Sequence, residues 1–329
     1  MAGGGRRLAS GLRPREGGGA GGGGSWLPFA PATWGAALER KRSLEARQRA
    51  AGAGARTVAA ALPGHVAAQR EVLGAVAGEL TGAWGAQGFR SEPLGGGGGL
   101  KVSLPDGMSV SWDGCDEAGC GGALGAAAMC LEEDLALMAP LEPGGPYCLV
   151  AAHICTSFGD LPDRMGRSLT RLHDPVPGYR EDVGAPMEAL FERMRPGGSG
   201  MWRTNWGLQY DSDPDPAESA RRPSSEDLLE RFERDGVGGC TWLRVEFQNV
   251  RKLAESGAVL FTIRTYIEPL AGCRGEGGAA AANLASNIRA LSPPLTSYKG
   301  LDEAPIREAV LRYLDGDPGS GPGGERLAR

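Results

Sequence analysis

The sequence lacks any apolar stretch of about 20 residues, the length that a helix needs to cross a bilayer. Its beginning also lacks the compact apolar core of a secretory signal. The formal net charge of −5 is spread without a basic stripe, which argues against nucleic acid and anionic membranes as the main partners. These absences predict a soluble intracellular protein.

Cysteine pairs and histidine clusters are also missing. The 7 cysteines include no CxxC pair, and no histidines accompany them at zinc-finger spacing. Reduced thiols are therefore expected, with a disulfide bond or a metal at Cys115 and Cys120 as the alternative. The glycine runs lack the strand, turn and helix of a dinucleotide fingerprint, so no flavin or nicotinamide site is expected in this chain.

Low-complexity segments lie at the two ends of the chain. Residues 1–25 and 316–329 are rich in glycine and charge and offer little apolar surface to offset the entropy of ordering, so both are predicted to be disordered. In the first segment Glu16 is the only acid among several arginines, which is compatible with an organelle transit peptide as well as with a cytoplasmic protein. Residues 26–315 are predicted to form one α+β domain.

Apolar residues three or four positions apart predict the helices. Leu73, Val76, Leu80 and Trp84 show this spacing most clearly, and they would line one side of a helix. Further helices are expected at residues 31–50, 185–194, 279–291 and 304–314.

Alternating apolar residues predict the strands. Residues 100–112 indicate a hairpin that turns at 105–107, and residues 135–138 and 148–154 indicate two further elements, the second a strand. The strongest signals are residues 242–248 and 259–266, which are predicted to pair as an antiparallel hairpin. Residues 211–227 are expected to be an acidic loop.

This last hairpin is predicted to gather polar groups. Arg244 and Glu246 share one face of their strand, because side chains alternate. A turn centred near Glu255 would place Glu246 opposite Arg264, with Tyr266 on the same face. The alternative is a solvent-facing side with a salt bridge worth under ~1 kcal/mol.

A second polar cluster occurs in the segment MWRTNWGL. Alternation sends Trp202 and Trp206 to one side, and Arg203 and Asn205 to the other. An arginine and an asparagine among indole rings suit an anionic group such as a carboxylate, although a purely structural network has the same spacing.

Histidine is scarce, with 3 in the chain. His65 precedes a helix, and His153 lies within an apolar strand, where a hydrogen-bonded core histidine is usual. His173 lies in LHDPVPGY, where Pro175 and Pro177 stiffen the backbone. A stiff backbone suits a metal ligand, but a single histidine is too few for zinc, and a turn-forming role is the alternative.

Several of these segments together resemble the haem-dependent oxidative N-demethylase family, alpha-subunit type. The matching runs are EEDLALM (132–138), SFGDLPDRMGRSLTRLHDPVPGY (157–179), WRTNW (202–206), LRVEFQNVRKL (243–253) and GAVLFTIRTY (257–266). The resemblance extends from about Trp26 to SYKGL (297–301). The chain departs from the family pattern at Phe158, Arg164, Phe247 and Ala254, where the family has Trp, Lys, Arg and Pro.

The resemblance implies a PAS-like antiparallel sheet with flanking helices, N- and C-terminal helical segments, and a bound b-type haem. It implies that His173 binds the iron, since one histidine suffices for an axial haem bond. The other residues implied in cofactor binding are Arg203, Asn205, Trp206 and Arg244, and those implied in catalysis are Glu246, Arg264 and Tyr266.

The resemblance also implies an activity. It is the O₂-dependent, monooxygenase-like oxidation of a methyl group on a small secondary amine, with release of formaldehyde and with electrons from a separate flavin or iron–sulfur reductase. The alternatives are a PAS-like haem-binding sensor or carrier without catalysis, and a domain that has kept the shape and lost the haem.

Overall fold

The computed structural model describes residues 13–14, 25–51, 57–95, 98–114, 122–156, 160–214, 223–275, 278–301 and 303–317. The predicted disordered ends lie almost entirely outside these residues, as do Cys115 and Cys120. The cysteines within the described ranges are free thiols. No helix in these ranges is long and apolar enough to cross a membrane.

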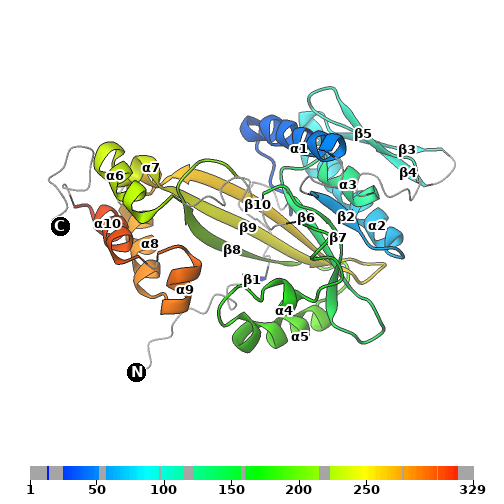
Figure 1. Ribbon diagram of the computed structural model, residues 1–329. Coiled ribbons are helices and arrows are strands. Elements are labelled where there is room, and N and C mark those ends of the chain that lie inside the picture. Colours follow the sequence, from blue (N-terminus) through cyan, green and yellow to red (C-terminus); the bar gives the residue numbers. More distant parts are fainter. Residues whose placement is uncertain are drawn as a thin grey trace.

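A seven-stranded antiparallel sheet with the order β1-β8-β9-β10-β6-β7-β2 forms the centre of the molecule (Figure 1). Its strands are β1 (Arg13–Pro14), β2 (Ala59–Ala61), β6 (Asp134–Pro140), β7 (Tyr147–His153), β8 (Met201–Gln209), β9 (Trp242–Lys252) and β10 (Val259–Pro269). The predicted strands at 148–154, 242–248 and 259–266 correspond to β7, β9 and β10, and the element expected at 135–138, whose type was left open, is the strand β6.

A smaller sheet contains β3 (Arg90–Leu94), β4 (Gly99–Ser103) and β5 (Ser109–Trp112). The predicted hairpin is confirmed, since Leu100 pairs with Trp112 and Ser103 with Ser109. Gly107 allows the turn, because its φ of 82° is a conformation that side-chain-bearing residues rarely adopt.

The α-helices of the described ranges are α1 (Pro31–Ala51), α2 (Val66–Trp84), α3 (Gly122–Ala128), α4 (Leu169–Leu172), α5 (Ala185–Arg193), α6 (Ser225–Asp235), α7 (Val237–Cys240), α8 (Ala279–Arg289), α9 (Pro293–Tyr298) and α10 (Ala304–Asp315). Two 3₁₀ turns, η3 (Gly85–Gln87) and η5 (Leu270–Arg274), and a π-helical turn, η4 (Arg180–Gly184), complete them. The five predicted helices correspond to α1, α2, α5, α8 and α10, so the α+β class is confirmed.

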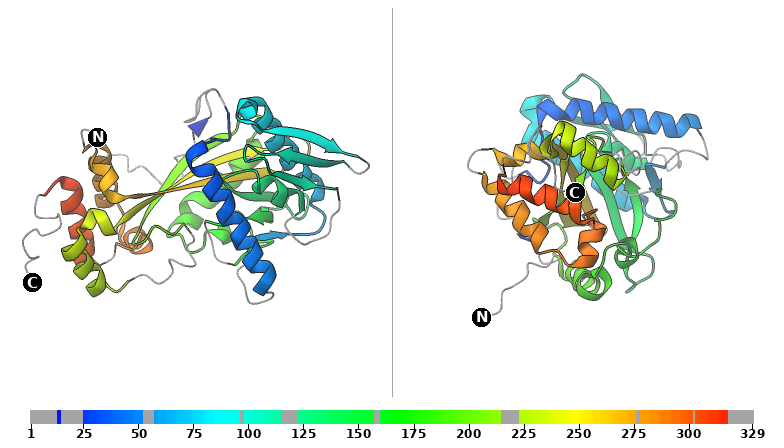
Figure 2. Two further views of the ribbon diagram at one scale, coloured as in Figure 1. Left: turned by 90° about the horizontal axis from the view of Figure 1, so that it is seen from above. Right: turned by 60° about the vertical axis from the view of Figure 1, so that its left-hand side comes forward.

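Helices cover both faces of the large sheet (Figures 1 and 2). We call the side packed against α4, η4 and α5 the α5 face; there Leu149 and Val250 pack in one cluster with Leu172 and Phe191. We call the opposite side the α1 face; its cluster joins β6 and β10 to α1, α2 and α3. Helices α6 to α10 gather at one end of β8, β9 and β10 around their own apolar cluster, which we call the C-terminal cluster (Figure 1).

Helix α6 is one of the elements that the sequence prediction missed. Its residues 225–227 belong to the segment expected to be an acidic loop. The Ser224 hydroxyl accepts a hydrogen bond from the Asp227 amide at 3.1 Å and caps the helix. Leu228 and Phe232, four residues apart, bury the inner side, so a short apolar stripe suffices in a strongly charged segment.

The register predicted for the β9–β10 hairpin is wrong by one residue. Glu246 pairs with Thr265, and Arg264 pairs with Phe247. The last hydrogen-bonded pair, Leu253 N–H to Ala258 C=O, encloses four loop residues, so the turn centres between two residues and not on Glu255. A shift of one residue sends every side chain of a strand to the other face. Arg264 and Tyr266 therefore lie on the α1 face, and Glu246 lies on the α5 face.

Candidate functional site

Strands β8 and β9 bring four polar side chains to the α5 face. Arg203 pairs with Gln248 and Asn205 with Glu246 in the antiparallel register. Direct partners point to the same side of a sheet, so the predicted alternation of this segment is confirmed. Arg244 lies two residues before Glu246 and shares its face.

Glu246 is held in place by its two neighbours on the strand. Its Oε1 accepts a hydrogen bond from Arg244 Nε at 3.2 Å, and its Oε2 accepts one from Gln248 Nε2 at 3.1 Å. The other nitrogens of Arg244 donate to the backbone carbonyls of Pro214 and Thr156. Arg244 thus connects the sheet to two loops and fixes the orientation of the Glu246 carboxylate.

His173 lies at the end of α4, which packs on the α5 face. Its Nδ1 is 2.9 Å from the Leu169 carbonyl oxygen. A carbonyl oxygen can only accept, so Nδ1 carries the proton and Nε2 keeps its lone pair. Nε2 has no hydrogen-bond partner among the described residues.

The proline-rich turn after His173 folds back over the imidazole. The Val176 amide donates to the His173 carbonyl at 2.8 Å, and the Tyr179 amide donates to the Val176 carbonyl at 3.1 Å. Gly178, with φ of 74°, allows this reversal. The Tyr179 ring consequently stacks on the imidazole, with centroids 4.2 Å apart and an interplanar angle of 9°.

Burial lowers the pKa of His173, so the imidazole is neutral at neutral pH. The hydrogen bond to Leu169 raises the pKa, the charge of Arg203 lowers it and that of Glu246 raises it, so the three side chains lie close enough to interact. A neutral imidazole with a free Nε2 is the form that binds a metal.

Arg203 is a half-buried cation with no ion-pair partner among the described residues. Burial lowers the pKa of its guanidinium, and the charges of Tyr179 and Glu246 act in the opposite direction. Its Nε atom is buried and has no hydrogen-bond partner. A buried donor without a partner is costly, so this position favours an anionic group from a ligand.

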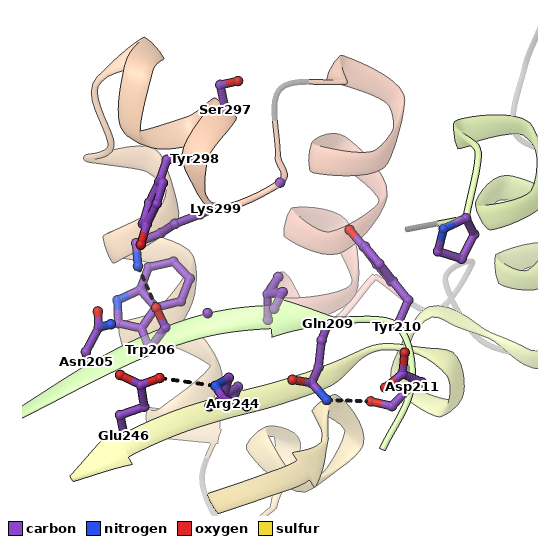
Figure 3. Close-up of a pocket in the computed structure, with 14 residues that line it drawn as sticks. Asn205, Trp206, Gln209, Tyr210, Asp211, Arg244, Glu246, Ser297, Tyr298 and Lys299 are labelled. Carbon is purple, nitrogen blue, oxygen red and sulfur yellow. Dashed lines mark hydrogen bonds and ion pairs between the residues drawn. The ribbon is translucent and has the colours of Figure 1, made fainter. Parts of the chain in front are cut away.

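A cavity of about 440 Å³ opens beside these residues, between the ends of β8 and β9 and the loop that follows α9 (Figure 3). Asn205, Arg244 and Glu246 line its sheet side. Tyr298 and Lys299 extend toward it from α9 (Figure 3). His173 and Arg203 lie outside its lining, on the same face of the sheet.

Tyr298 and Lys299 are site residues that sequence reasoning missed. The Lys299 ammonium donates to the Trp206 carbonyl at 2.5 Å and lies 4.4 Å from the centroid of the Trp206 ring. Burial lowers the pKa of Lys299 to about 8. The sequence did contain a signal for them, the run SYKGL (297–301), which is the last segment of the family resemblance and to which no role was assigned.

Arg264 and Tyr266 do not take part in this cluster, contrary to the face-sharing predicted for them. Arg264 forms ion pairs with Glu132 and, at 3.6 Å, with Glu133, and donates to the Pro28 carbonyl at 2.8 Å. Its guanidinium lies 5.3 Å from the Tyr266 ring. These contacts join β10 to the segment before α1 on the α1 face.

Trp206 also points to the α1 face by alternation, yet it borders the cavity. Among the described residues, the two-residue strand β1 is the only strand beyond β8, and it pairs with Met201 and Trp202. Lys299, at the end of α9, lies over the Trp206 ring at this edge of the sheet.

His153 is confirmed as a core residue, since its Nε2 is 2.9 Å from Glu45 Oε1 and its side chain is buried.

The comparisons with known proteins identify the family of the chain. The model of the family described as haem-dependent oxidative N-demethylase, alpha subunit-like, matches residues 31–311. The chain belongs to this family. Its membership indicates a haem-dependent oxidative N-demethylase-like function. No curated protein matches the chain.

The residues present fit the haem that the N-demethylase family name implies. An axial histidine must be neutral with one free ring nitrogen, and a hydrogen bond from the other nitrogen to a backbone carbonyl fixes that form. His173 meets both conditions. The unpaired Arg203 on the same face suits a propionate group.

Proposed function

We propose that the chain binds haem b on the α5 face, where His173 Nε2 would bind the iron. The single observation that carries the proposal is the hydrogen bond from Nδ1 to the Leu169 carbonyl, which leaves Nε2 free. Arg203 would pair with a haem propionate, while Arg244 fixes Glu246 from the side. Asn205, on the same face, would border the bound group, whereas Trp206 points to the α1 face and lines the neighbouring cavity.

The proposed reaction is the oxidative demethylation of a secondary amine. One N-methyl amine, one O₂, two electrons and two protons give the demethylated amine, formaldehyde and water. The electrons would come from a separate flavin or iron–sulfur reductase, in keeping with the alpha-subunit description of the family. The bound haem would supply the activation of O₂.

The protein's own residues would bind and orient the amine. At neutral pH a secondary amine is a cation, and the Glu246 carboxylate faces the cavity with its position fixed by Arg244 and Gln248. A charge-assisted hydrogen bond from the ammonium to Glu246 would hold the methyl group in one orientation. The packing of α4 and α5 on the sheet would keep bulk water from the His173 side.

The first experiment tests haem binding. The wild-type chain expressed with added haem is expected to show a Soret band, and His173→Ala is expected to lose it. His65→Ala is the matched control, because His65 lies at the start of α2, and it is expected to keep the band. A colourless wild-type protein would contradict the proposal.

The second experiment tests catalysis. With NADPH, a reductase and a panel of methylated amines, the haem-loaded chain is expected to release formaldehyde, and Glu246→Gln is expected to release at least about tenfold less because it removes the charge that holds the amine. A haem-bound protein that releases no formaldehyde with any amine would instead favour the sensor or carrier function.

A further inference from the structure

The cavity beside β8 and β9 is lined by two groups of opposite charge, Glu246 and Lys299, that are not paired with each other. Glu246 lies on its sheet side and Lys299 on its α9 side (Figure 3). The charge of Glu246 raises the pKa of Lys299, so the two groups interact across the space. Their charged atoms form no ion pair in the described part of the chain, where the ionic partner of Glu246 is Arg244.

Lys299 has capacity for an anion. Its side chain is 8% exposed, and its contacts are the Trp206 carbonyl and the face of the Trp206 ring. An ammonium group has three donors, and the described residues accept one hydrogen bond from this group. A buried ammonium without a carboxylate partner is costly, and an anionic ligand group would offset that cost.

Glu246 has capacity for a cation. Each of its oxygens accepts one hydrogen bond, whereas an ionised carboxylate offers about four acceptor positions. Arg244 donates to Glu246 through Nε alone, because its two terminal nitrogens donate to the Pro214 and Thr156 carbonyls. Arg244 therefore positions the Glu246 carboxylate and leaves it accessible from the cavity.

We propose that the cavity binds a zwitterion, namely a secondary amine that also carries a carboxylate, such as an N-methylated amino acid. Glu246 binds the ammonium end, and Lys299 binds the carboxylate end. The inference rests on the proposed function and deepens it by naming the substrate class. A methylated amine without a carboxylate would leave Lys299 without a counter-charge.

The size of the cavity agrees with this class. Its volume of about 440 Å³ lies within the range of about 300–1,000 Å³ for small-molecule sites. Trp206 and Leu208 add apolar surface to the lining of the cavity, which suits the carbon atoms of an amino acid.

The test compares three ligands of similar shape by calorimetry on the haem-loaded full chain. N-methylglycine has both charges, N-methylisobutylamine has only the ammonium, and butyrate has only the carboxylate. The wild type is expected to bind N-methylglycine about tenfold or more tightly than either of the others. Lys299→Gln should bind N-methylglycine no more tightly than N-methylisobutylamine. Glu246→Gln should bind N-methylglycine no more tightly than butyrate.

Lys101→Met is the matched control, because Lys101 lies in the small sheet and pairs with Glu92 at 2.8 Å; it should preserve all three affinities. Equal affinities for N-methylglycine and N-methylisobutylamine, or no binding of N-methylglycine, would overturn the inference. So would a Lys299→Gln protein that loses its Soret band and keeps the ligand preference, since Lys299 would then serve the haem.

The failure of this inference is distinguishable from failure of the proposed function. Demethylation of N-methylisobutylamine with no preference for N-methylglycine would overturn the zwitterion and support the N-demethylase activity. A wild-type chain without a Soret band would overturn both.

Discussion

At the residue scale, the site depends on two groups whose charged form is disfavoured by desolvation. His173 is neutral because burial lowers its pKa, and Lys299 loses its proton more easily than usual for the same reason. Each shift gives a pH dependence with a definite sign.

For His173 the prediction concerns stability. The unfolded chain protonates this histidine near its ordinary pKa of 6.5, whereas the folded chain does so only at lower pH. The unfolded state therefore binds more protons in that window, and the free energy of unfolding should decrease as the pH falls below about 6.5, by at most about 1.4 kcal/mol per pH unit. Urea denaturation of the haem-free protein at several pH values measures this slope.

His173→Gln should show a smaller dependence of stability on pH than the wild type over the same range, because glutamine takes up no proton. Some dependence should remain, since burial also lowers the pKa of His65. Identical slopes would contradict the assignment of a buried neutral imidazole at position 173.

For Lys299 the prediction concerns ligand binding. The charged groups near its ammonium are Glu246, which raises the pKa, and Arg203, which lowers it, while burial has the largest effect and brings the pKa to about 8. Carboxylate binding requires the protonated ammonium, so affinity for N-methylglycine should be constant below about pH 8 and fall above it, by at most about tenfold per pH unit. Calorimetry at pH 7 and pH 9 measures the change, and Lys299→Gln should bind weakly at both.

At the element scale, strand β10 separates two sets of polar groups. Thr265 and Ile263 face the side of Glu246, and Arg264 and Tyr266 face α1.

Glu133, an ion-pair partner of Arg264, is buried. Burial raises the pKa of Glu133, and neither of its carboxylate oxygens has a hydrogen-bond partner. Arg264 is therefore the main compensating charge for two buried carboxylates.

Arg264→Met should consequently lower the free energy of unfolding by about 3–5 kcal/mol while leaving the Soret band in place, because it removes the cation that is paired with Glu132 and Glu133. Chemical denaturation and the absorption spectrum measure the two effects. Arg289→Met is the control: its ion pair with Asp315 is about half-exposed and should contribute less than about 1 kcal/mol. Loss of haem with unchanged stability would show that Arg264 belongs to the haem site.

At the scale of the whole molecule, two apolar clusters hold the two parts of the site. The cluster under α4 and α5 positions His173, and the C-terminal cluster positions α9 and Lys299 against β8. Both parts meet on one sheet, although their residues are more than a hundred positions apart in the chain.

Selective weakening of each cluster should therefore separate the two functions. Ile306→Ala in the C-terminal cluster and Leu161→Ala under α4 each remove a fully or almost fully buried side chain, and each should cost about 2–5 kcal/mol of stability. The first should weaken N-methylglycine binding and keep the Soret band, and the second should weaken haem retention. Calorimetry measures the binding of N-methylglycine, and haem titration measures haem retention. Equal loss of haem affinity in the two variants would contradict the assignment of haem binding and ligand binding to separate apolar clusters.

The sequence by itself determined many of the elements of this protein. Helical and strand periodicities are local, so α1, α2, α5, α8, α10 and the strands β4, β5, β7, β9 and β10 could be predicted from neighbouring residues. The position of His173 within a stiff turn and the alternation around Arg203 were predictable for the same reason. Helix α6 was not, because its apolar stripe is short and its surroundings are charged.

Only the tertiary structure decided which side chains share a site. The loop between β9 and β10 fixed the register, and one residue of difference moved Arg264 and Tyr266 away from Glu246. The packing of α8 to α10 brought Lys299 to the edge of β8, a contact between residues 93 positions apart that no local pattern encodes. Local spacing specifies which way a side chain points along its own element, but the partner it meets depends on turns and packing that involve the whole chain.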